Sequence, residues 1–295
     1  MGEIAAVHVR APAKINLFLR VLAREFSGYH QIETLFAAVD FCDELRVERG
    51  GEGVSLDVVG PDVGPEEQNL VYRAAQLFLE TASLEVGIRM WLTKNIPAEA
   101  GLGGGSSDAG ATLRALDILL GNPVSESDLL RCAVHLGCDV PFFTSGAGRA
   151  LAWGRGEQLL MLPTERELTV LLALPSVQLS TAHAYEELGP DIRAAPSARD
   201  LGAFDRPERL AEISTNDFEA SVFARHPQLG ELRTAIDGEG ALTARLSGSG
   251  AALFALFGDE ARARSANESL ASSWPDVRFV VTHTLATQPI PTVVG

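Results

Sequence analysis

The stretch Pro97-Ala-Glu-Ala-Gly-Leu-Gly-Gly-Gly-Ser-Ser-Asp-Ala109 decides the fold of this chain. Its glycines stand directly before a segment in which Ala109, Leu113, Leu116 and Leu120 recur at helical spacing. Because glycine lacks a Cβ, its backbone can approach a ligand closely, and the first N–H groups of a helix have no partner within it. Those donors and the positive end of the helix dipole favour a bound phosphate. The stretch therefore predicts an anion site at the start of a helix.

The residues that follow the glycines refine this prediction. Ser106 and Ser107 supply hydroxyls where the N-cap is expected, and Gly121 marks the end of the helix. The carboxylate of Asp108 would repel a phosphate unless it points away or faces a metal ion. The stretch lacks the lysine of the Walker pattern, and Ser106 replaces the third glycine of the dinucleotide fingerprint. It is therefore a third kind of glycine-rich loop. The alternative is a tight connection that binds no ligand.

Length and charge limit the class of protein. A chain of 295 residues is long enough for two packed lobes, and 46% hydrophobic residues can bury their cores. The 24 Lys and Arg residues against 39 Asp and Glu residues give a net charge of −15, without a basic run. We therefore expect no nucleic-acid partner. An anionic small molecule must be held by a few local cations and by backbone donors.

The compartment follows from what the sequence lacks. The first residues show no secretory or transit pattern, and no apolar run approaches the ~18 residues of a membrane span. Cys42, Cys132 and Cys138 are an odd number without metal-type spacing, which fits reduced thiols. Scattered histidines make a zinc site improbable. We expect a cytoplasmic protein that binds no membrane, is a monomer or weak homodimer, and has metal ligands that the sequence leaves unknown.

Near the start, residues 7–19 alternate as a strand that would place Lys14 and Asn16 on one face. Pro12 predicts an edge position or a bulge, because proline cannot donate to the ladder. Taken alone, Lys14 fits a solvated lysine. Tyr29 and His30 follow a glycine in a turn, where they could stack on and hydrogen-bond a flat ring or be ordinary turn residues.

Periodicity and punctuation predict the remaining elements of the first half. The expected strands cover 31–39, 44–48, 54–59 and 86–92; the helices start after caps at Asn69 and Ser125; and a hairpin covers 148–162. Pro141 favours an extended Val140, so Asp139 stands at a sharp exit from a helix. That is a common place for a plain turn aspartate, and also one where a carboxylate can be held rigidly beside a cleft.

The second half follows a different order. Strands are expected over 168–174, 242–246, 251–257 and 277–284, with helical segments over 207–237 and 260–272 and a surface loop over 190–206. This strand-helix-strand-strand-helix-strand order predicts a ferredoxin-like arrangement. Its middle turn, Ser247-Gly-Ser-Gly250, is a second cluster that can bring N–H groups near an anion.

Three of these motifs occur in the order seen in the GHMP kinases, the superfamily named for galactokinase, homoserine kinase, mevalonate kinase and phosphomevalonate kinase. They cover 13–17, 97–107 and 246–251. Within it the chain most resembles the 4-diphosphocytidyl-2-C-methyl-D-erythritol kinases, on the evidence of residues 11–19, 28–30, 101–107 and 137–143. That family often has Arg-x-Asp-Gly-Tyr-His where this chain has Glu25-Phe-Ser-Gly-Tyr-His30.

The resemblance implies an α+β, two-lobed GHMP kinase fold. Its N-terminal lobe, 1–164, would be ribosomal protein S5 domain 2-like and would carry the ATP phosphate loop, and its C-terminal lobe, 165–295, would be ferredoxin-like. The implied reaction is transfer of the γ-phosphoryl group of ATP, with Mg²⁺ bridging the phosphates, to the 2-hydroxyl of 4-diphosphocytidyl-2-C-methyl-D-erythritol. Asp139 would accept the hydroxyl proton, and Lys14 would keep Asp139 ionised and offset charge in the transition state.

The binding residues are carried over from the same resemblance. Those expected at ATP are Pro97, Ala98, Glu99, Ala100, Gly101, Leu102, Gly103, Gly104, Gly105, Ser106 and Ser107, with Asn69 and Lys94 near the adenine. Those expected at the acceptor are Asn16, Tyr29, His30, Thr181 and Tyr185. Tyr29 and His30 would take the cytosine by stacking and hydrogen bonding, and Tyr185 would stack on its opposite face.

Three alternatives remain open. Another GHMP kinase, acting on mevalonate, homoserine or a sugar, would need no base-stacking pair such as Tyr29 and His30. A catalytically silent nucleotide-binding relative would have no need to keep Lys14 and Asp139. A nucleic-acid-binding module, suggested by the likeness of the first lobe to a ribosomal-protein fold, conflicts with the acidic balance.

Overall fold

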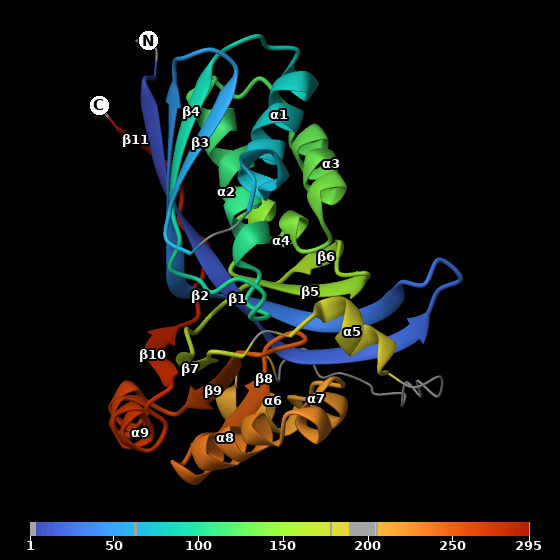
Figure 1. Cartoon of the computed structure of the whole chain (residues 1–295), viewed down its shortest axis with the longest axis vertical. Coiled ribbons are helices and arrows are strands. Elements are labelled where there is room, and N and C mark those ends of the chain that lie inside the picture. Colours follow the sequence, from blue (N-terminus) through green and yellow to red (C-terminus); the bar gives the residue numbers. More distant parts are fainter. Residues whose placement is uncertain (1–3, 62–63, 178, 189–203, 205, 295) are drawn as a thin grey trace.

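The computed structural model describes residues 4–61, 64–177, 179–188, 204 and 206–294. These residues form two sheets, and the helices α1 to α4 gather on one side of the first (Figure 1). The chain begins and ends beside the first sheet, because β11 near the C-terminus pairs with β1. The fold is the α+β, two-lobed arrangement that the sequence predicts.

The first sheet is built around two long antiparallel strands. Its strands are β1 (Ala6–Arg24), β2 (His30–Arg49), β3 (Val54–Val59), β4 (Ile88–Thr93), β5 (Arg149–Gly154), β6 (Gln158–Met161) and β11 (Thr292–Val294). Their order is β11-β1-β2-β4-β3, with β5 pairing β2 and β6 pairing β5. The strands predicted over 31–39 and 44–48 are one strand, β2. It pairs with β5 in its first half and with β4 in its second.

The bulge predicted at Pro12 is present. The β1–β2 register shifts between Pro12 and Ala13, because proline has no N–H to continue the ladder. Beyond it, Lys14 and Asn16 lie on the same side of β1, and both side chains are buried. The default interpretation of Lys14 as a solvated lysine is therefore wrong.

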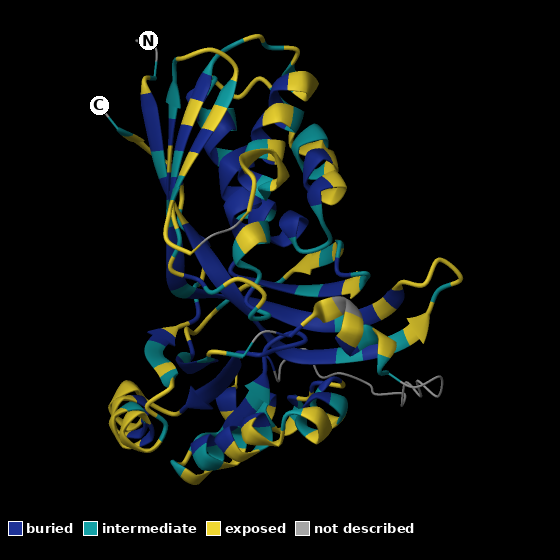
Figure 2. Ribbon diagram, viewed as in Figure 1, coloured by how far each residue is buried: buried dark blue, intermediate teal, exposed yellow. Residues whose placement is uncertain are grey.

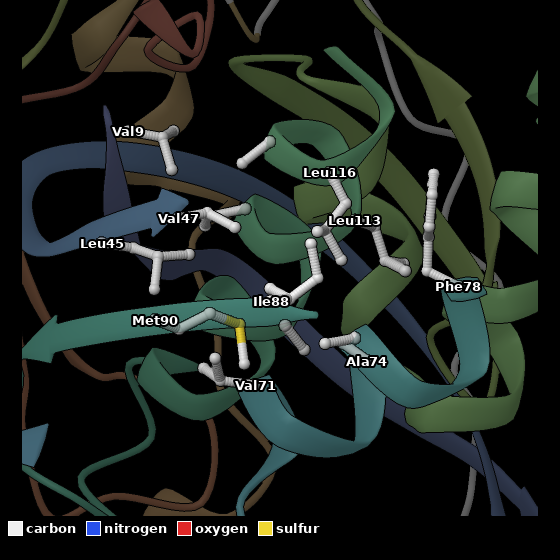
Figure 3. Packing of buried hydrophobic residues seen from close by; sticks show 14 of the residues in the cluster. Val9, Leu45, Val47, Val71, Ala74, Phe78, Ile88, Met90, Leu113 and Leu116 are labelled. Carbon is white, nitrogen blue, oxygen red and sulfur yellow. The ribbon is translucent and has the colours of Figure 1, made fainter. Parts of the chain in front are cut away.

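Helices cover one face of the first sheet. They are the short 3-10 helix η1 (Glu66–Gln68), α1 (Leu70–Ala82), α2 (Gly104–Leu119), α3 (Glu126–Leu136) and α4 (Val140–Ser145). Val47 and Met90 on the sheet meet Phe78 of α1 and Leu113 of α2 in the core between them (Figure 3). Buried residues fill this layer, and others line the long hairpin and the second sheet (Figure 2). No helix in the described part of the chain is both long and apolar enough to cross a membrane.

The helix starts confirm some caps and correct others. Asn69 caps α1 by accepting a hydrogen bond from Val71 N, and Ser125 caps α3 in the same way. The N-cap of α2 is Gly103, with φ +70°, so Ser106 and Ser107 lie inside the first turn and the prediction of a serine cap is wrong.

Val140 was also expected to be extended, and it begins a helix instead. It is the first residue of α4, and Pro141 follows it within the first turn. A proline there breaks no intrahelical hydrogen bond, because the first N–H groups have no partner within the helix. Asp139 is therefore the N-cap of α4.

The second sheet has the predicted ferredoxin-like order, β10-β7-β9-β8, with every pair antiparallel. Its strands are β7 (Thr169–Pro175), β8 (Thr243–Leu246), β9 (Leu253–Phe257) and β10 (Val277–His283). Its helices are α6 (Pro207–Ile213), α7 (Glu219–Arg225), α8 (Pro227–Gly238) and α9 (Glu260–Ser273), and the unpredicted α5 (Thr181–Glu186) precedes them. The loop predicted over 190–206 lies almost wholly outside the described residues.

Candidate active site

A cavity of about 980 Å³ opens where segments of both lobes meet. Its lining includes Lys14 of β1, the start of α2 at Gly104, Asp139 before α4, Tyr185 of α5 and Ser249 in the turn between β8 and β9. The bend of the long hairpin β1–β2 brings the hairpin's end beside α5, so residues distant in sequence share this space (Figure 1).

The residues predicted for chemistry and for binding line this one cavity, except Leu102 and Ser107. Leu102 is buried in the core, and its carbonyl accepts a hydrogen bond of 2.9 Å from Lys14 N. The hydroxyl of Ser107 is buried, and its N–H donates to Gly103 O within the helix. Neither residue presents its side chain to the cavity.

The glycine loop forms an anion cradle at the N-terminus of α2. The N–H groups of Gly104, Gly105 and Ser106 precede the first intrahelical hydrogen bond of α2, which Ser107 N donates to Gly103 O. Gly104, Gly105 and Ser106 all line the cavity. These donors, at the positive end of the helix dipole, suit the phosphates of a nucleotide.

The turn Ser247–Gly250 packs directly against this loop. Gly101 has φ +78°, and a Cβ at that position would lie 2.0 Å from the carbonyl oxygen of Ser247. Ser247 Oγ donates to Gly101 O at 3.0 Å. Only glycine fits at position 101, because both the positive φ and the short distance to Ser247 O exclude a side chain. The two glycine clusters, which lie far apart in the sequence, form one wall of the cavity.

Lys14 and Asp139 face each other in the cavity. Lys14 Nζ lies 3.7 Å from Asp139 Oδ2 and donates to Asn16 Oδ1 at 2.7 Å. Asn16 in turn donates from Nδ2 to Thr34 Oγ1 at 2.8 Å, which fixes the orientation of its amide. Burial lowers the pKa of the Lys14 ammonium, while Asp139 acts in the opposite direction. A cation and a carboxylate are thus held close together beside the anion cradle.

Lys94 and Asp108 form a second, deeper charge cluster. Lys94 Nζ donates to Asp108 Oδ2 at 2.7 Å and to Asp43 Oδ2, and all three side chains are buried. Burial works to lower the pKa of Lys94, but Asp108 and Asp43 outweigh it and the pKa is raised. Burial raises the pKa of Asp108 to about 8. Asp108 lines the same cavity as the cradle, where it is paired with Lys94 rather than left alone.

The other end of the cavity is aromatic. The rings of His30 and Tyr185 stack at 4.9 Å between centroids and 21° between planes, and Phe218 meets Tyr185 edge-on at 4.8 Å. Tyr29 stands nearby with its side chain more than half exposed. Burial, followed by the charge of Arg24, lowers the pKa of His30 below its ordinary value. A neutral imidazole and flat rings at this end suit a heteroaromatic base.

Some lining residues were not predicted as site residues. Gly248 and Ser249 line the cavity, and the hydroxyls of Thr181 and Ser249 lie 3.0 Å apart. Arg155 reaches the cavity from the turn between β5 and β6. The run Ser247–Gly250 was a signal for the first two. Nothing local marks Arg155, because its place in the cavity depends on the packing of β5 beside β2. Within the described residues, no group of three or more His, Cys, Asp or Glu could hold a metal ion.

Comparison with known proteins identifies the family. Residues 69–147 match the GHMP kinases N terminal domain, and residues 193–276 match the GHMP kinases C terminal domain. A 4-diphosphocytidyl-2-C-methyl-D-erythritol kinase of Desulfotalea psychrophila is 39% identical over 87% of this chain and 88% of its own. That of Prosthecochloris aestuarii is 36% identical over 91% of this chain and 95% of its own.

The solved structures agree with this grouping. A crystal structure of 4-(cytidine 5'-diphospho)-2C-methyl-D-erythritol kinase superposes with a TM-score of 0.79 and 36% identity, covering 94% of this chain and 98% of the other. A homoserine kinase from Cytophaga hutchinsonii, with a TM-score of 0.77 and 22% identity over 100% of this chain and 99% of its own, shares the fold. The chain belongs to the GHMP kinases and, among them, to the 4-diphosphocytidyl-2-C-methyl-D-erythritol kinase family.

Proposed function

We propose that the protein transfers the γ-phosphoryl group of ATP to the 2-hydroxyl of 4-diphosphocytidyl-2-C-methyl-D-erythritol. The reaction is a step of the non-mevalonate, or MEP, route to isoprenoid precursors. The names of its relatives support this reading, and one observation carries it here. A single cavity joins the anion cradle of α2, the Lys14–Asp139 pair and an aromatic end.

The roles of the charged pair follow from what phosphoryl transfer requires. The reaction depends on in-line positioning and on charge stabilisation rather than on covalent help from the protein. Asp139 would accept the proton of the attacking hydroxyl. Lys14, 3.7 Å away, would keep Asp139 ionised and offset the negative charge that spreads over the transferred group. Asn16 would hold the ammonium of Lys14 in place.

The cradle fits the phosphates of ATP. The donors are the backbone N–H groups of Gly104, Gly105 and Ser106 at the N-terminus of α2. Because glycine has no Cβ, a phosphate can approach these N–H groups closely. Ser106 in the cavity lining would offer an oxygen ligand to Mg²⁺, and the ion would supply positive charge against the phosphates. Asp108 does not fit that task, because Lys94 holds its Oδ2 and its Oδ1 is buried. Asn69 and Lys94 stay proposals for the adenine end.

The aromatic end would hold the cytidine part of the acceptor. His30 is kept neutral and can donate and accept hydrogen bonds to a base, and Tyr29 offers an exposed ring for stacking. His30 covers one face of Tyr185, so stacking of the base on Tyr185 would use the opposite face or need His30 to move. Thr181, beside Ser249, would contact the same ligand.

The lobe boundary, the location and the oligomeric state are proposed from the sequence. The boundary between lobes is proposed at 164 and 165, between β6 and β7, although β11 returns to the first sheet. The cytoplasmic location stays a prediction. So does the state of monomer or weak homodimer.

The test is ADP release from ATP and Mg²⁺ by the purified protein. The acceptors compared would be 4-diphosphocytidyl-2-C-methyl-D-erythritol, mevalonate, homoserine and galactose, with mass spectrometry to show which gains a phosphoryl group. We expect turnover with the cytidine compound alone. Turnover with another acceptor would support the kinase activity but refute the proposed cytidine pocket. No turnover with any acceptor would favour a catalytically silent relative.

A further inference from the structure

The turn that carries Tyr29 is closed by its backbone, but its ring is not held by burial. Glu25 N donates to Tyr29 O at 2.7 Å, and Gly28 N donates to Glu25 O at 3.0 Å. These hydrogen bonds fix the position of the Tyr29 backbone, from which the ring projects. The residue is 57% exposed, so core packing does not select the direction of its ring. A ring that must stack on a ligand needs another constraint.

Arg155 supplies such a constraint from a different part of the chain. It stands in the turn Gly154–Gly156, between β5 and β6, and its guanidinium carbon lies 4.1 Å from the centroid of the Tyr29 ring. Glu25 fixes this guanidinium: Arg155 Nη2 donates to Glu25 Oε2 at 2.6 Å, and Nε donates to Oε1 at 3.4 Å. The guanidinium of Arg155 is therefore held by two hydrogen bonds to Glu25 while it stacks on the ring of Tyr29.

We infer that Arg155, anchored by Glu25, is a positioning residue that holds the ring of Tyr29 ready to stack on the base of the acceptor, and so sets the affinity for that substrate. The inference rests on the proposed function. Arg155 and Tyr29 line the cavity, whereas Glu25 acts on the ligand through Arg155.

The geometry explains why this arrangement favours binding. A guanidinium over one face of a tyrosine is attracted by the ring quadrupole and leaves the other face free. A ring that is ordered before binding loses less side-chain entropy when the base stacks on it. The pKa of Glu25 is lowered, first by the hydrogen bond from Arg155 and then by that from Ser27, so the anchor is ionised at neutral pH.

Ser27 contributes to the same anchor. Its Oγ donates at 2.8 Å to Glu25 Oε2, the oxygen that also accepts from Arg155 Nη2. Arg155 Nη2 donates to Ser27 Oγ at 3.4 Å as well. The turn between β1 and β2 therefore supplies both a carboxylate and a hydroxyl to the guanidinium that lies over Tyr29.

The test is steady-state kinetics of Arg155→Gln, Glu25→Gln and the double variant, with each substrate varied at saturation of the other. We expect each single change to raise the KM for the cytidine acceptor about three- to tenfold, with kcat and the KM for ATP nearly unchanged. The double variant should be no worse than Arg155→Gln, because Glu25 acts through Arg155. Arg155→Lys should rescue only part of the loss, because lysine lacks the planar fork. Arg264→Gln, which removes an exposed pair with Glu260 on α9, is the control.

Calorimetric titration with CDP separates this inference from the proposed function. If the wild type shows no turnover, the function fails, and the Kd for CDP in wild type and Arg155→Gln still tests the positioning role. An acceptor KM and a CDP Kd unchanged in Arg155→Gln would overturn the inference and leave the function standing. A fall in kcat, or an equal rise in the KM for ATP, would show a general structural effect and would overturn it as well.

Discussion

Lys14 Nζ lies 3.7 Å from Asp139 Oδ2 but donates its short hydrogen bond, of 2.7 Å, to Asn16 Oδ1. The ammonium therefore lies beside Asp139 without making its shortest hydrogen bond to it. A carboxylate left in this state can accept a proton from a substrate hydroxyl, because its oxygen is not already saturated by a charge-assisted hydrogen bond. The role of this pair is the first matter for experiment.

Asp139→Asn should reduce kcat about 100- to 10,000-fold, because the amide cannot accept the hydroxyl proton. The Kd for ATP should change little, because Asp139 lies outside the glycine loop. Single-turnover kinetics and calorimetric titration with ATP measure the two quantities. Asp57→Asn, an exposed change on β3, controls for the loss of one negative charge. Normal turnover at saturation together with weaker ATP binding would refute the role of Asp139 as base.

Gly101→Ala should damage both the fold and ATP binding. The added methyl would meet the carbonyl oxygen of Ser247 at 2.0 Å, and the positive φ of 78° disfavours any side chain. We expect a lower Tm and a weaker Kd for ATP, because the loop and the turn 247–250 must separate. Gly258→Ala, where a Cβ meets nothing within 4 Å, is the matched control. A variant of Gly101 with wild-type Tm and ATP affinity would show that the close packing is not needed.

Gly105→Ala tests the cradle more selectively than Gly101→Ala does. A Cβ at Gly105 would meet only Leu70 Cδ1, at 3.7 Å, and alanine in a helix is favoured over glycine by about 0.5–1 kcal/mol. We therefore expect an unchanged or higher Tm. The Kd for ATP should rise, because the methyl group limits the approach of a phosphate to the N–H groups at the start of α2. Unchanged ATP affinity would place the phosphates away from this turn of the helix.

The sequence was most informative where a local pattern specifies a local structure. The glycines before α2 and the caps at Asn69 and Ser125 were predictable, because spacing and cap chemistry act over a few residues. The order of the ferredoxin-like sheet was predictable from the succession of strands and helices along the chain. The start of α4 was not predictable, because proline has two opposing effects. It disfavours a helical conformation for the residue before it, here Val140, but it is itself well suited to the first turn of a helix.

Features that depend on packing between distant parts of the chain could not be predicted from the sequence. Nothing near Asp108 in sequence shows that Lys94 and Asp43 enclose it, because strands β2 and β4 bring those residues together. The contact of Arg155 with Tyr29 needs β5 to pair with β2, and the meeting of Gly101 with Ser247 needs both lobes. The site residues came mainly from the family resemblance, and their common cavity came only from the structure.

Asp108 should make the stability of the protein depend on pH. Its folded pKa, about 8, lies above the ordinary value of about 3.9 expected in the unfolded chain. The unfolded state therefore binds fewer protons between these values. The stability from protonated Asp108 is complete below about pH 4 and is lost as the pH rises through 8, with a slope of the order of 1 kcal/mol per pH unit.

Asp108→Asn should remove this dependence. The Tm of the variant should rise relative to wild type between pH 5.5 and pH 8, as scanning calorimetry would show. Asp57→Asn serves again as the surface control. A constant difference in Tm between Asp108→Asn and wild type over this range would mean that Asp108 is ionised throughout, held by Lys94 alone.

His30 should make acceptor binding sensitive to acid. Burial, with the charge of Arg24, lowers its pKa, so the imidazole is neutral at pH 7 and gains a proton only below the ordinary value of about 6.5. Protonation removes the acceptor nitrogen that a cytosine amino group needs. The KM for the cytidine acceptor should rise as the pH falls through the lowered pKa of His30, while the KM for ATP stays nearly constant. His30→Gln should have a raised acceptor KM at pH 7 that does not change further in acid.

The same protonation should lower stability, because a folded pKa below the unfolded one gives stability that is present above about pH 6.5 and lost as the pH falls through the folded value. Kinetics with each substrate saturating, and Tm measured in the same buffers, separate the two effects. His135→Gln on the exposed face of α3 controls for the loss of an imidazole elsewhere. If the acceptor KM of the wild type stays flat over the acid range in which its Tm falls relative to that of His30→Gln, His30 does not accept a hydrogen bond from the base. The stacked pair of His30 and Tyr185 would then serve only to shape the end of the cavity.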